Sequence, residues 1–587
     1  MNYLFSTLSS GWYWRDPSET IPLGLASVAA ALRATGRCVS GIHVDWHEDP
    51  LKALLQRIEY EEIDVLCMGA LSKEFITLRE TISAVRKNYP HIKIIVGGYI
   101  ITSQPEFIVN HLDIDFGCIG YGEETICEFA ECLESNGDFS KIKGLIYKDE
   151  TGKFIINPMR PQPKCLDDLP FPALELFGFS GGNQLLPIEL SRECVGGCTF
   201  CYRTPGHKYV SKSINRFFLE LDYWVKMFAV TKIEIRDELF CRNKKITLEI
   251  CRRIKVYNIK YLIFLKPDFI SDEIMQAFAE SGCFAIFIGI ESMCQRVLSS
   301  MRKNLTTEQI ENALRIARKY SVHITGHIIF GDTVETYNMA KESLDWRLKN
   351  LHYDVYLNLI SAHPNSAIYK HGIETGRIKD KLHFLESGCA PINLSAMSDI
   401  EYSKLHSQIQ IINNLSVSTA KNIRFKCNED NSLLMLGDCI HCETVNAIDS
   451  KSLNFSYLIH FDTICNECNT HLKFVFKEAG NYLDSRYFNE FNYEGKKLVV
   501  WGLSEKAKFR LFMNDGMRNA LVAIVDRDYS IYQNKFMAFD VQSPKILSKT
   551  EFDVLYIGSS VARESILSMA REIVGSELYK KEVMIMP

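Results

Sequence analysis

Three cysteines occur within eight residues, in the segment Ser-Arg-Glu-Cys-Val-Gly-Gly-Cys-Thr-Phe-Cys-Tyr that begins at Ser191. Thiolates favour iron–sulfur clusters, and such clusters usually take four protein ligands. Three ligands from Cys194, Cys198 and Cys201 would leave one iron open, and an open metal position can chelate a substrate. A zinc site, for which His207 is the nearest further donor, and unpaired thiols are the alternatives. The segment therefore indicates a cluster with a catalytic role.

Two Cys-x2-Cys pairs lie in the last third of the chain, with 22 residues between them. Their members are Cys439, Cys442, Cys465 and Cys468. Four thiolates at this spacing can close a tetrahedral zinc site, and a site without an open position is structural. An auxiliary iron–sulfur cluster on the same thiolates is the alternative. The spacing predicts a zinc-ribbon-like module over residues 427–475.

The composition is that of a globular protein with several domains. The chain has 587 residues, 47% of them hydrophobic and 24% charged, which is too long for one compact core. A formal net charge of −5 offers no global positive field, so nucleic acid is not an expected partner. No apolar run reaches the roughly 18 residues that span a bilayer, and the N-terminus lacks a secretory signal. We therefore expect a cytoplasmic protein, without membrane attachment, whose 19 cysteines are thiols and metal ligands.

Short apolar strands alternate with helix-like segments over residues 1–150. The predicted strands are Asn2–Leu8, Val39–Val44, Asp64–Met68, Ile92–Val96 and Asp115–Ile119. This alternation predicts a parallel sheet covered on both faces, with its ligand at the carboxyl ends of the strands. Those ends are rich in glycine, and the candidate binding residues there are Gly69, Gly97, Gly98, Gly120 and Gly122. The expectation is a Rossmann-like binding domain.

A second alternating region follows a proline-rich linker over residues 151–186. Its predicted strands, within residues 187–400, are Pro187–Leu190, Lys232–Arg236, Tyr261–Leu265, Phe284–Ile288, His323–Ile329 and Asp354–Leu359. Six such units suit a partly closed parallel barrel, whose sites lie at the carboxyl ends of the strands. The three clustered cysteines come directly after the first of these strands.

The rest of the chain is expected to form a helical connector, the cysteine module and a last domain. The connector spans residues 401–426 and the last domain residues 490–587. In that domain Lys497–Trp501 runs into Gly502, and Leu521–Val525 ends at Asp526, which predicts a small Rossmann-like α/β domain. A lone glycine after a strand is weak evidence for a nucleotide, so no nucleotide is assigned to it.

The ordered motifs of the chain resemble those of a known family. Cys-x3-Cys-x-aromatic-Cys is the signature of the radical S-adenosylmethionine (SAM) enzymes, and four strand-end motifs similar to that family's follow it in order. These motifs are Asp237-Glu238-Leu239-Phe240, Gly289-Ile290-Glu291-Ser292, Gly331 with Glu335-Thr336, and His363-Pro364-Asn365-Ser366. The first domain resembles the cobalamin-binding domain of the B12-dependent subgroup through Pro22-Leu23-Gly24-Leu25, Gly97-Gly98 and Gly120-Tyr121-Gly122-Glu123-Glu124-Thr125. The resemblance covers roughly the first 400 residues.

This resemblance implies an α/β architecture with four parts. They are an N-terminal Rossmann-like cobalamin-binding domain, a partial (βα)6 TIM-type radical SAM barrel, a C-terminal zinc-ribbon-like insert and a small Rossmann-like α/β domain. The implied cofactors are a [4Fe–4S] cluster on the three thiolates, SAM, cobalamin and, from the paired cysteines, zinc. Glu291 and Ser292 are the implied contacts to the ribose and amino-acid parts of SAM, and Asp237 is the implied contact to its ammonium group.

The same resemblance implies methyl transfer to an unactivated carbon of a small molecule, such as a sugar or natural product, through a 5′-deoxyadenosyl radical. An electron donor such as flavodoxin or ferredoxin is the implied protein partner. Radical cyclisation, oxidation or rearrangement with the same cofactors is one alternative. A non-catalytic cobalamin-binding protein is another, and the intact cysteine triad and the Gly-Ile-Glu-Ser motif argue against it.

Overall fold

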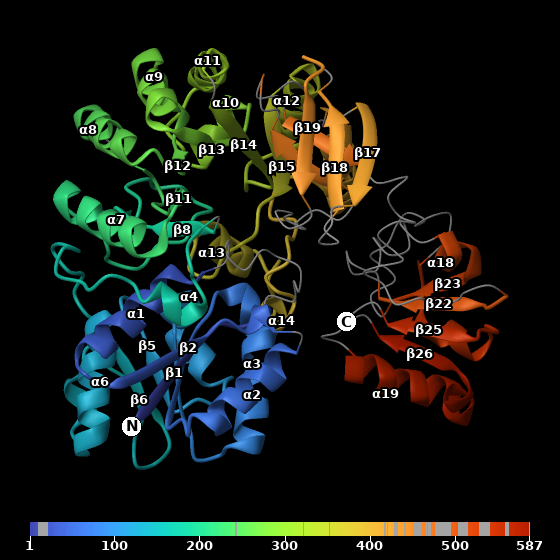
Figure 1. Cartoon of the computed structure of the whole chain (residues 1–587). Coiled ribbons are helices and arrows are strands. Elements are labelled where there is room, and N and C mark those ends of the chain that lie inside the picture. Colours follow the sequence, from blue (N-terminus) through green and yellow to red (C-terminus); the bar gives the residue numbers. More distant parts are fainter. Residues whose placement is uncertain are drawn as a thin grey trace. The chain divides into compact units, whose positions relative to one another are not determined.

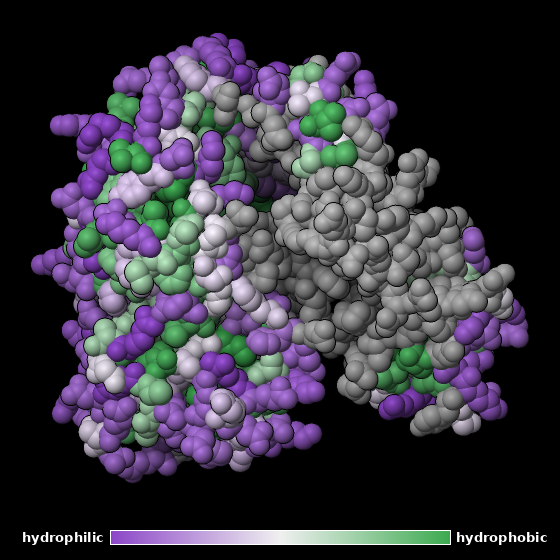
Figure 2. Space-filling model, in the orientation of Figure 1, coloured by the Kyte–Doolittle hydropathy of each residue, from purple (hydrophilic) through white to green (hydrophobic). Residues whose placement is uncertain are grey.

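The computed structural model describes most of the chain and shows two compact units that divide near residue 417 (Figure 1). The described residues are 1–9, 21–47, 49–182, 184–240, 243–320, 322–350, 353–415, 418–419, 421–427, 433–439, 442–449, 460–464, 467, 471–475, 495–502, 515–526, 541–557 and 563–585. None of the helices within these ranges is both long and apolar enough to cross a membrane. Figure 2 shows mainly hydrophilic side chains on the described surface in this view, with apolar residues in separate patches.

Seven strands form the first sheet, in the order β2-β1-β3-β4-β5-β6-β7. Five are parallel, namely β1 (Asn2–Ser6), β2 (Cys38–Ile42), β3 (Val65–Gly69), β4 (Lys93–Gly97) and β5 (Phe116–Cys118). Two antiparallel strands, β6 (Leu145–Lys148) and β7 (Phe154–Ile156), complete it, and β7 lies inside the expected linker. The turn between them is closed by Asp149, whose Oδ1 accepts hydrogen bonds from the backbone N–H of Thr151 and Lys153. Neither strand is among those predicted from the sequence, so this hairpin is an addition to the expected sheet.

Helices cover both faces of the first sheet (Figure 1). They are α1 (Leu23–Ala34), α2 (Pro50–Tyr60), α3 (Phe75–Asn88), α4 (Tyr99–Ser103), α5 (Pro105–Val109) and α6 (Glu123–Ser135). Tyr3 and Phe5 of β1 belong to the core that includes α1 and α6, whereas Leu4 belongs to the core that includes α2 and α3. Because successive strand residues point to opposite faces, this division is that of a sheet buried on both sides.

Six parallel strands form the second sheet, in the order β8-β11-β12-β13-β14-β15. They are β8 (Leu185–Ile188), β11 (Lys232–Ile235), β12 (Lys260–Leu265), β13 (Cys283–Glu291), β14 (His323–Phe330) and β15 (Asp354–Leu359). The helices of this region are α7 (Ile214–Phe228), α8 (Lys244–Ile254), α9 (Asp272–Ser281), α10 (Gln295–Ser300), α11 (Thr307–Ala317), α12 (Tyr337–Lys349), α13 (Ala367–Glu374), α14 (Lys381–Glu386) and α15 (Asp399–Leu415). The two edge strands, β8 and β15, each pair with one neighbour and not with each other, so the sheet stays open. This arrangement confirms the expected partial barrel.

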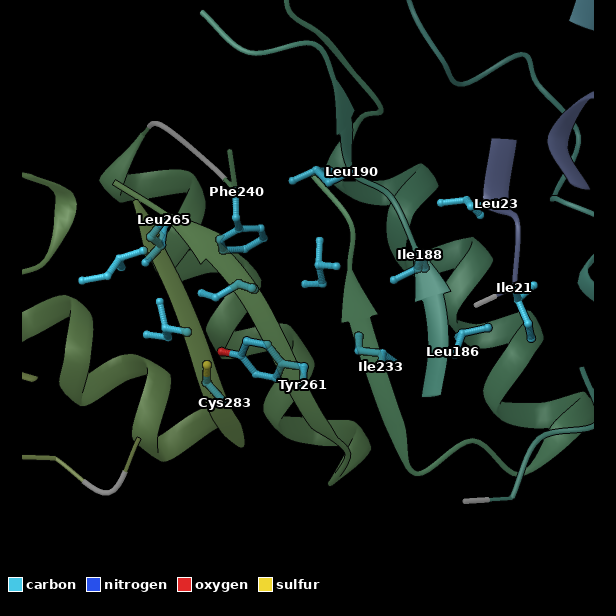
Figure 3. Close-up of a cluster of buried hydrophobic side chains, with 14 of the residues drawn as sticks. Ile21, Leu23, Leu186, Ile188, Leu190, Ile233, Phe240, Tyr261, Leu265 and Cys283 are labelled. Atoms are coloured by element: carbon cyan, nitrogen blue, oxygen red, sulfur yellow. The ribbon is translucent and has the colours of Figure 1, made fainter. Parts of the chain in front are cut away.

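One hydrophobic core joins the first sheet to the barrel. Figure 3 shows Ile21 and Leu23 beside β8, and they share a buried cluster with Leu186 and Ile188 of that strand. The proline-rich segment contributes the short 3₁₀ helix Leu174–Phe177, whose two end residues are buried in the same cluster. The segment is therefore packed against both regions and is not a free spacer.

The second unit contains three further sheets. Two are three-stranded: β16 (Ser418–Thr419), β21 (His471–Val475) and β20 (His460–Ile464), and β17 (Lys421–Cys427), β18 (Leu433–Asp438) and β19 (Val445–Asp449). The third is parallel, with β24 (Val541–Gln542), β23 (Leu521–Val525), β22 (Leu498–Trp501), β25 (Val554–Ile557) and β26 (Glu582–Ile585) in that order, and helices α18 (Asp515–Ala520) and α19 (Arg563–Val574). The chain order 3-2-1-4-5 of this parallel sheet is that of a Rossmann-like fold.

Candidate functional site

The cysteine loop begins where β8 ends. A two-residue ladder between β9 (Ser191–Arg192) and β10 (Val210–Ser211) closes its base. Within the loop, the backbone N–H of Thr199 donates to the carbonyl of Met301 at 3.1 Å, and its carbonyl accepts from Ile368 at 3.1 Å. These bonds attach the loop to the end of α10 and the start of α13, so the loop is held at the carboxyl end of the barrel.

The sulfur atoms of the loop lie near one another. The backbone N–H of Gly196 donates to Cys194 Sγ at 3.3 Å. A Cβ placed on Gly196 would lie 3.4 Å from Cys194 Sγ and 3.9 Å from Cys198 Sγ, so both sulfurs occupy the same side of this residue. Burial, together with the neighbouring Cys198, Glu238 and Cys194, raises the pKa of the Cys201 thiol to about 12. Thiolates that repel one another in this way favour a bound cation.

The donors of this loop are three thiols, the ligand type that iron–sulfur clusters favour. Gly196 places no side chain beside Cys194 Sγ and Cys198 Sγ, so the backbone can approach a group bound there. The residues present therefore fit a cluster.

A buried ion pair lies beside the cysteine loop. Glu291, the last residue of β13, has its Oε1 2.6 Å from Lys303 Nζ, and both side chains are about nine-tenths buried. Burial lowers the pKa of Lys303, but Glu291 and then Cys198 and Cys194 raise it more, which leaves a net increase. A Cβ on Gly289 would lie 2.1 Å from Glu291 Oε1 and 2.7 Å from Lys303 Nζ, so the pair needs glycine at this position. The sequence motif contains Gly289 and Glu291, but nothing in it points to Lys303.

The other two predicted SAM contacts are occupied by protein groups. Ser292 Oγ accepts a hydrogen bond from the backbone N–H of Cys294 at 3.1 Å and lies 3.2 Å from Ser343 Oγ of α12. Asp237 is buried, and its Oδ1 accepts from the backbone N–H of Leu190 at 2.7 Å and of Ser191 at 2.9 Å. Its Oδ2 accepts from Ser191 Oγ at 2.6 Å, and burial raises the pKa of this carboxyl to about 6. This geometry favours a bracing role for Asp237 over its expected contact with an ammonium group.

The predicted glycines gather at the carboxyl edge of the first sheet. Gly69 and Gly97 are partners in the register of β3 and β4. Gly98 has φ +81°, and a Cβ there would lie 2.9 Å from the carbonyl oxygen of Ala70. A Cβ on Gly122 would lie 3.1 Å from Val28 Cγ2. The strand order reverses between β1 and β3, and parallel sheets bind their ligands at such a reversal.

Buried polar atoms of this edge lack hydrogen-bond partners within the described part of the chain. They are the hydroxyl oxygens of Tyr99 and Tyr121 and Nε2 of His207, whose other ring nitrogen, Nδ1, lies 3.5 Å from Glu193 Oε1. The His207 ring, from the segment after the cysteine loop, lies 4.7 Å from that of Tyr121, and Tyr99 packs against Tyr202. Buried polar groups need partners, so this place fits a ligand with many hydrogen-bonding groups. Cobalamin, with its ring of amide side chains, is such a ligand.

One face of the barrel strands is half-buried and polar. The alternate residues Ile286 and Ile288 of β13 lie in the hydrophobic core, whereas Phe287 lies on the other face and stacks on Phe264 at 5.2 Å. On the same face as Phe287, His327 of β14 pairs in register with Tyr356 of β15. Their rings stack at 5.8 Å, and His327 Nδ1 lies 3.3 Å from Asn358 Nδ2. Uncharged hydrogen-bonding groups thus lie on this face of β14 and β15.

The predicted zinc site can be described only in half. Cys439 is buried and Cys442 is half-buried, and the backbone N–H of Cys439 donates to the carbonyl of Thr444 at 2.9 Å in the turn between β18 and β19. Cys465 and Cys468 lie outside the described residues. Zinc at these four positions therefore stays a prediction.

Comparison with known proteins agrees with this arrangement. The family model for the B12 binding domain matches residues 16–130, and that for the radical SAM superfamily matches residues 188–347. An uncharacterized methyltransferase of Pyrococcus horikoshii is 25% identical over 364 residues, which span 60% of this chain and 78% of that protein. The anaerobic magnesium-protoporphyrin IX monomethyl ester cyclase of Synechocystis sp. is 25% identical over 324 residues, 52% of this chain and 64% of the cyclase.

A solved structure shows the same fold. It is that of the radical S-adenosylmethionine methyltransferase TsrM from Kitasatospora setae, which matches 64% of this chain and 76% of its own, with a TM-score of 0.53 and 16% identity. The two family models match the two sheets that carry the glycine edge and the cysteine loop. The chain therefore combines a domain of the radical SAM superfamily with a B12 binding domain.

Proposed function

We propose that this protein is a cobalamin-dependent radical SAM methyltransferase that methylates an unactivated carbon of a small molecule. The observation that carries the proposal is that one unit holds both the cysteine loop with its Glu291–Lys303 pair and the glycine edge with its unpartnered polar atoms. Two of the three similar proteins named above are methyltransferases by name. A radical barrel alone does not need a cobalamin domain, whereas a methyl carrier explains why both occur in one chain.

The residues take distinct roles in this proposal. Cys194, Cys198 and Cys201 bind the cluster, and Glu291 accepts hydrogen bonds from SAM while Lys303 holds the carboxylate in place. When bound, the cluster supplies the electron that cleaves SAM, and cobalamin supplies a methyl carrier. The electron reaches the cluster from a donor such as flavodoxin or ferredoxin.

The substrate in this proposal binds against the polar face of the barrel. His327, Tyr356 and Asn358 offer uncharged donors, acceptors and an aromatic surface. Burial, the largest influence, lowers the pKa of His327, so its ring is neutral near pH 7 and both donates and accepts hydrogen bonds. These groups suit an uncharged ligand rich in hydroxyl or amide groups, which includes sugars and many natural products.

Counting products tests the reaction. Methyl transfer by this route yields S-adenosylhomocysteine and 5′-deoxyadenosine in similar amounts, each rising with methylated product. Replacing the three loop cysteines together with Ala should remove the iron, the visible absorption and all 5′-deoxyadenosine. Cleavage of SAM by that triple variant would disprove the cluster assignment.

Radical cyclisation is the alternative that a specific observation favours, because one similar protein is a cyclase by name. It needs the same domains and cofactors, so the products decide between the two. Turnover that gives 5′-deoxyadenosine without S-adenosylhomocysteine would replace methyl transfer by cyclisation or rearrangement.

A further inference from the structure

Arg192 connects the two halves of the first unit at the base of the cysteine loop. Its Nη1 donates to Glu123 Oε1 at 2.7 Å and its Nη2 to Ser27 Oγ at 3.2 Å, both in the B12 binding domain. Its Nε donates to Glu189 Oε1 at 2.9 Å, just after β8 of the barrel. The guanidinium carbon lies 5.2 Å from the centre of the Tyr121 ring. One side chain thus contacts two helices of the first domain and the first strand end of the second.

These contacts are shielded from water. The exposed fractions are 13% for the Arg192 side chain, 6% for Glu123 and 11% for Glu189. A guanidinium with two buried carboxylates is fully paired, whereas removing it leaves uncompensated buried charge. Ser27 Oγ also donates to Glu123 Oε1 at 2.8 Å, so α1 and α6 are tied to each other at the same point. The contact is therefore costly to open and specific in geometry.

Arg192 lies only two residues before Cys194, so its contacts affect where the first proposed cluster ligand is placed. Ser191 is held to the barrel by Asp237, and Arg192 is held to the B12 binding domain. Cys194 comes only two residues later, after Glu193, whose left-handed φ of +63° turns the chain into the loop. The first cluster ligand is thus placed by two adjacent residues, one anchored to each domain.

The first-domain side of the contact reaches the predicted cofactor edge. Glu123 and Tyr121 belong to the same glycine-rich segment as Gly120 and Gly122. The hydroxyl of Tyr121 is one of the unpartnered buried atoms there. A ligand that orders this segment therefore also orders the partner of Arg192.

We propose that Arg192 is a positioning residue that couples cobalamin binding in the first domain to cluster binding in the cysteine loop. This inference rests on the proposed function, because it needs both cofactors. By linkage, a cluster that favours the contact must raise the affinity for cobalamin by the same factor as cobalamin raises the stability of the cluster. Without Arg192 the two domains should bind their cofactors independently.

The test measures this coupling and needs no substrate. Hydroxocobalamin is titrated by absorbance, under anaerobic conditions, into the full chain with a reconstituted cluster and into the triple variant with Ala at the three loop cysteines. We expect the cluster to lower the Kd for cobalamin by about 10-fold. The same pair of titrations with Arg192→Met, and with the milder Glu123→Gln, should give a factor near one.

A neighbouring carboxylate gives a matched control. Glu124 follows Glu123 on α6, but its side chain is exposed and pairs with Arg160 of the proline-rich segment, 2.9 Å away. Glu124→Gln should keep the full coupling factor. Arg192→Lys keeps the charge but lacks the forked donors, so it should restore only part of the coupling.

The outcomes separate the inference from the function on which it rests. A wild-type protein that binds no cobalamin, or no cluster, overturns the proposed function and this inference together. Binding of both cofactors without coupling in the wild type overturns the inference alone. Coupling that survives in both Arg192→Met and Glu123→Gln does the same. Because Glu123→Gln changes one atom of a buried group, it keeps the test valid if Arg192→Met fails to fold.

Discussion

At the scale of single residues, the proposed SAM site depends on the absence of a side chain as much as on charge. Gly289 leaves the space in which Glu291 and Lys303 meet beside the cysteine loop. Glu291 itself has a left-handed φ of +63°, which an L-residue adopts only when its surroundings enforce it. The buried lysine is the part of the site that the motif does not contain. The ion pair with Lys303 fixes the position of the Glu291 carboxyl group, which then offers a hydrogen-bond acceptor in a defined place.

Gly289→Ala should therefore weaken SAM binding without removing the cluster. The new methyl would lie 2.1 Å from Glu291 Oε1, so the carboxylate must move. We expect the Kd for SAM to rise about 10-fold or more, which is the loss of about 1.4 kcal/mol, at unchanged iron content. Gly24→Ala is the matched control, because a Cβ there meets nothing within 4 Å. Equal SAM affinities in the two variants would remove Glu291 from the site.

At the scale of elements, short connections at the carboxyl ends of strands are braced by buried acids. Asp237, after β11, holds the turn that leads from β8 into the cysteine loop. Glu335, after β14, holds the start of the next connection, since its Oε2 accepts from the backbone N–H of Gly331 at 2.6 Å. In both places a buried carboxyl group accepts hydrogen bonds from backbone N–H groups that lack a partner within their own loop. These acids make the loops precise enough to carry a site.

Asp237→Asn should loosen the turn before the cysteines. An amide loses charge-assisted bonds to two backbone N–H groups, worth about 2 kcal/mol together. The amides of Leu190 and Ser191 should then exchange hydrogen about 30-fold faster in the cluster-free protein. Exchange at the wild-type rate would show that other contacts hold the turn.

Glu335 should make the stability of the barrel depend on pH. Burial raises the pKa of this carboxyl to about 8, well above its ordinary value of 4.5. The folded state then holds a proton that the unfolded state has lost, so stability falls as pH rises from about 4.5 to about 8. Glu335→Gln removes this loss, and the drop in melting temperature between pH 6 and pH 8.5 should become smaller. Glu150→Gln, at an exposed position, should leave the wild-type drop, and an unchanged drop in Glu335→Gln would contradict the assignment.

At the scale of the whole molecule, the first unit behaves as one folded body because its two sheets share a core. Ile21 and Leu23 of the first domain pack with Leu186 and Ile188 of the barrel (Figure 3). The buried contact of Arg192 lies close to the same strand end. If a flexible linker joined the two domains, bringing them together would cost conformational entropy each time. The shared core holds them together before any ligand binds, so binding does not carry that cost.

Leu186→Ala should destabilise both sheets together. This side chain is fully buried, and truncating such a leucine costs about 2–5 kcal/mol. Chemical unfolding followed by probes in each domain should show one transition, shifted by the same amount. Leu219→Ala on α7, at a side chain that is 56% exposed, should change stability by less than about 0.5 kcal/mol. Separate transitions for the two domains would contradict a common core.

The sequence by itself determined the alternation of strands and helices over most of the first 400 residues and the types of the two cofactor domains. Apolar runs bounded by turn residues are local, so they predicted β1 to β5 and all six barrel strands to within a few residues. The cysteine and Gly-Ile-Glu-Ser motifs are local too, and each is contained in one strand and the loop after it. The antiparallel strands β6 and β7 were missed, because they lie on either side of the predicted domain boundary at residue 150.

Only the tertiary structure decided which distant residues meet. Lys303 reaches Glu291 from a different segment, and Arg192 joins Glu123 across 69 positions of the chain. The tertiary structure also shows that Asp237 accepts a hydrogen bond from the backbone N–H of Leu190, in the turn after β8. The physical reason is that ion pairs and hydrogen bonds of this kind depend on the packing of several elements. No period or spacing within one element records that packing.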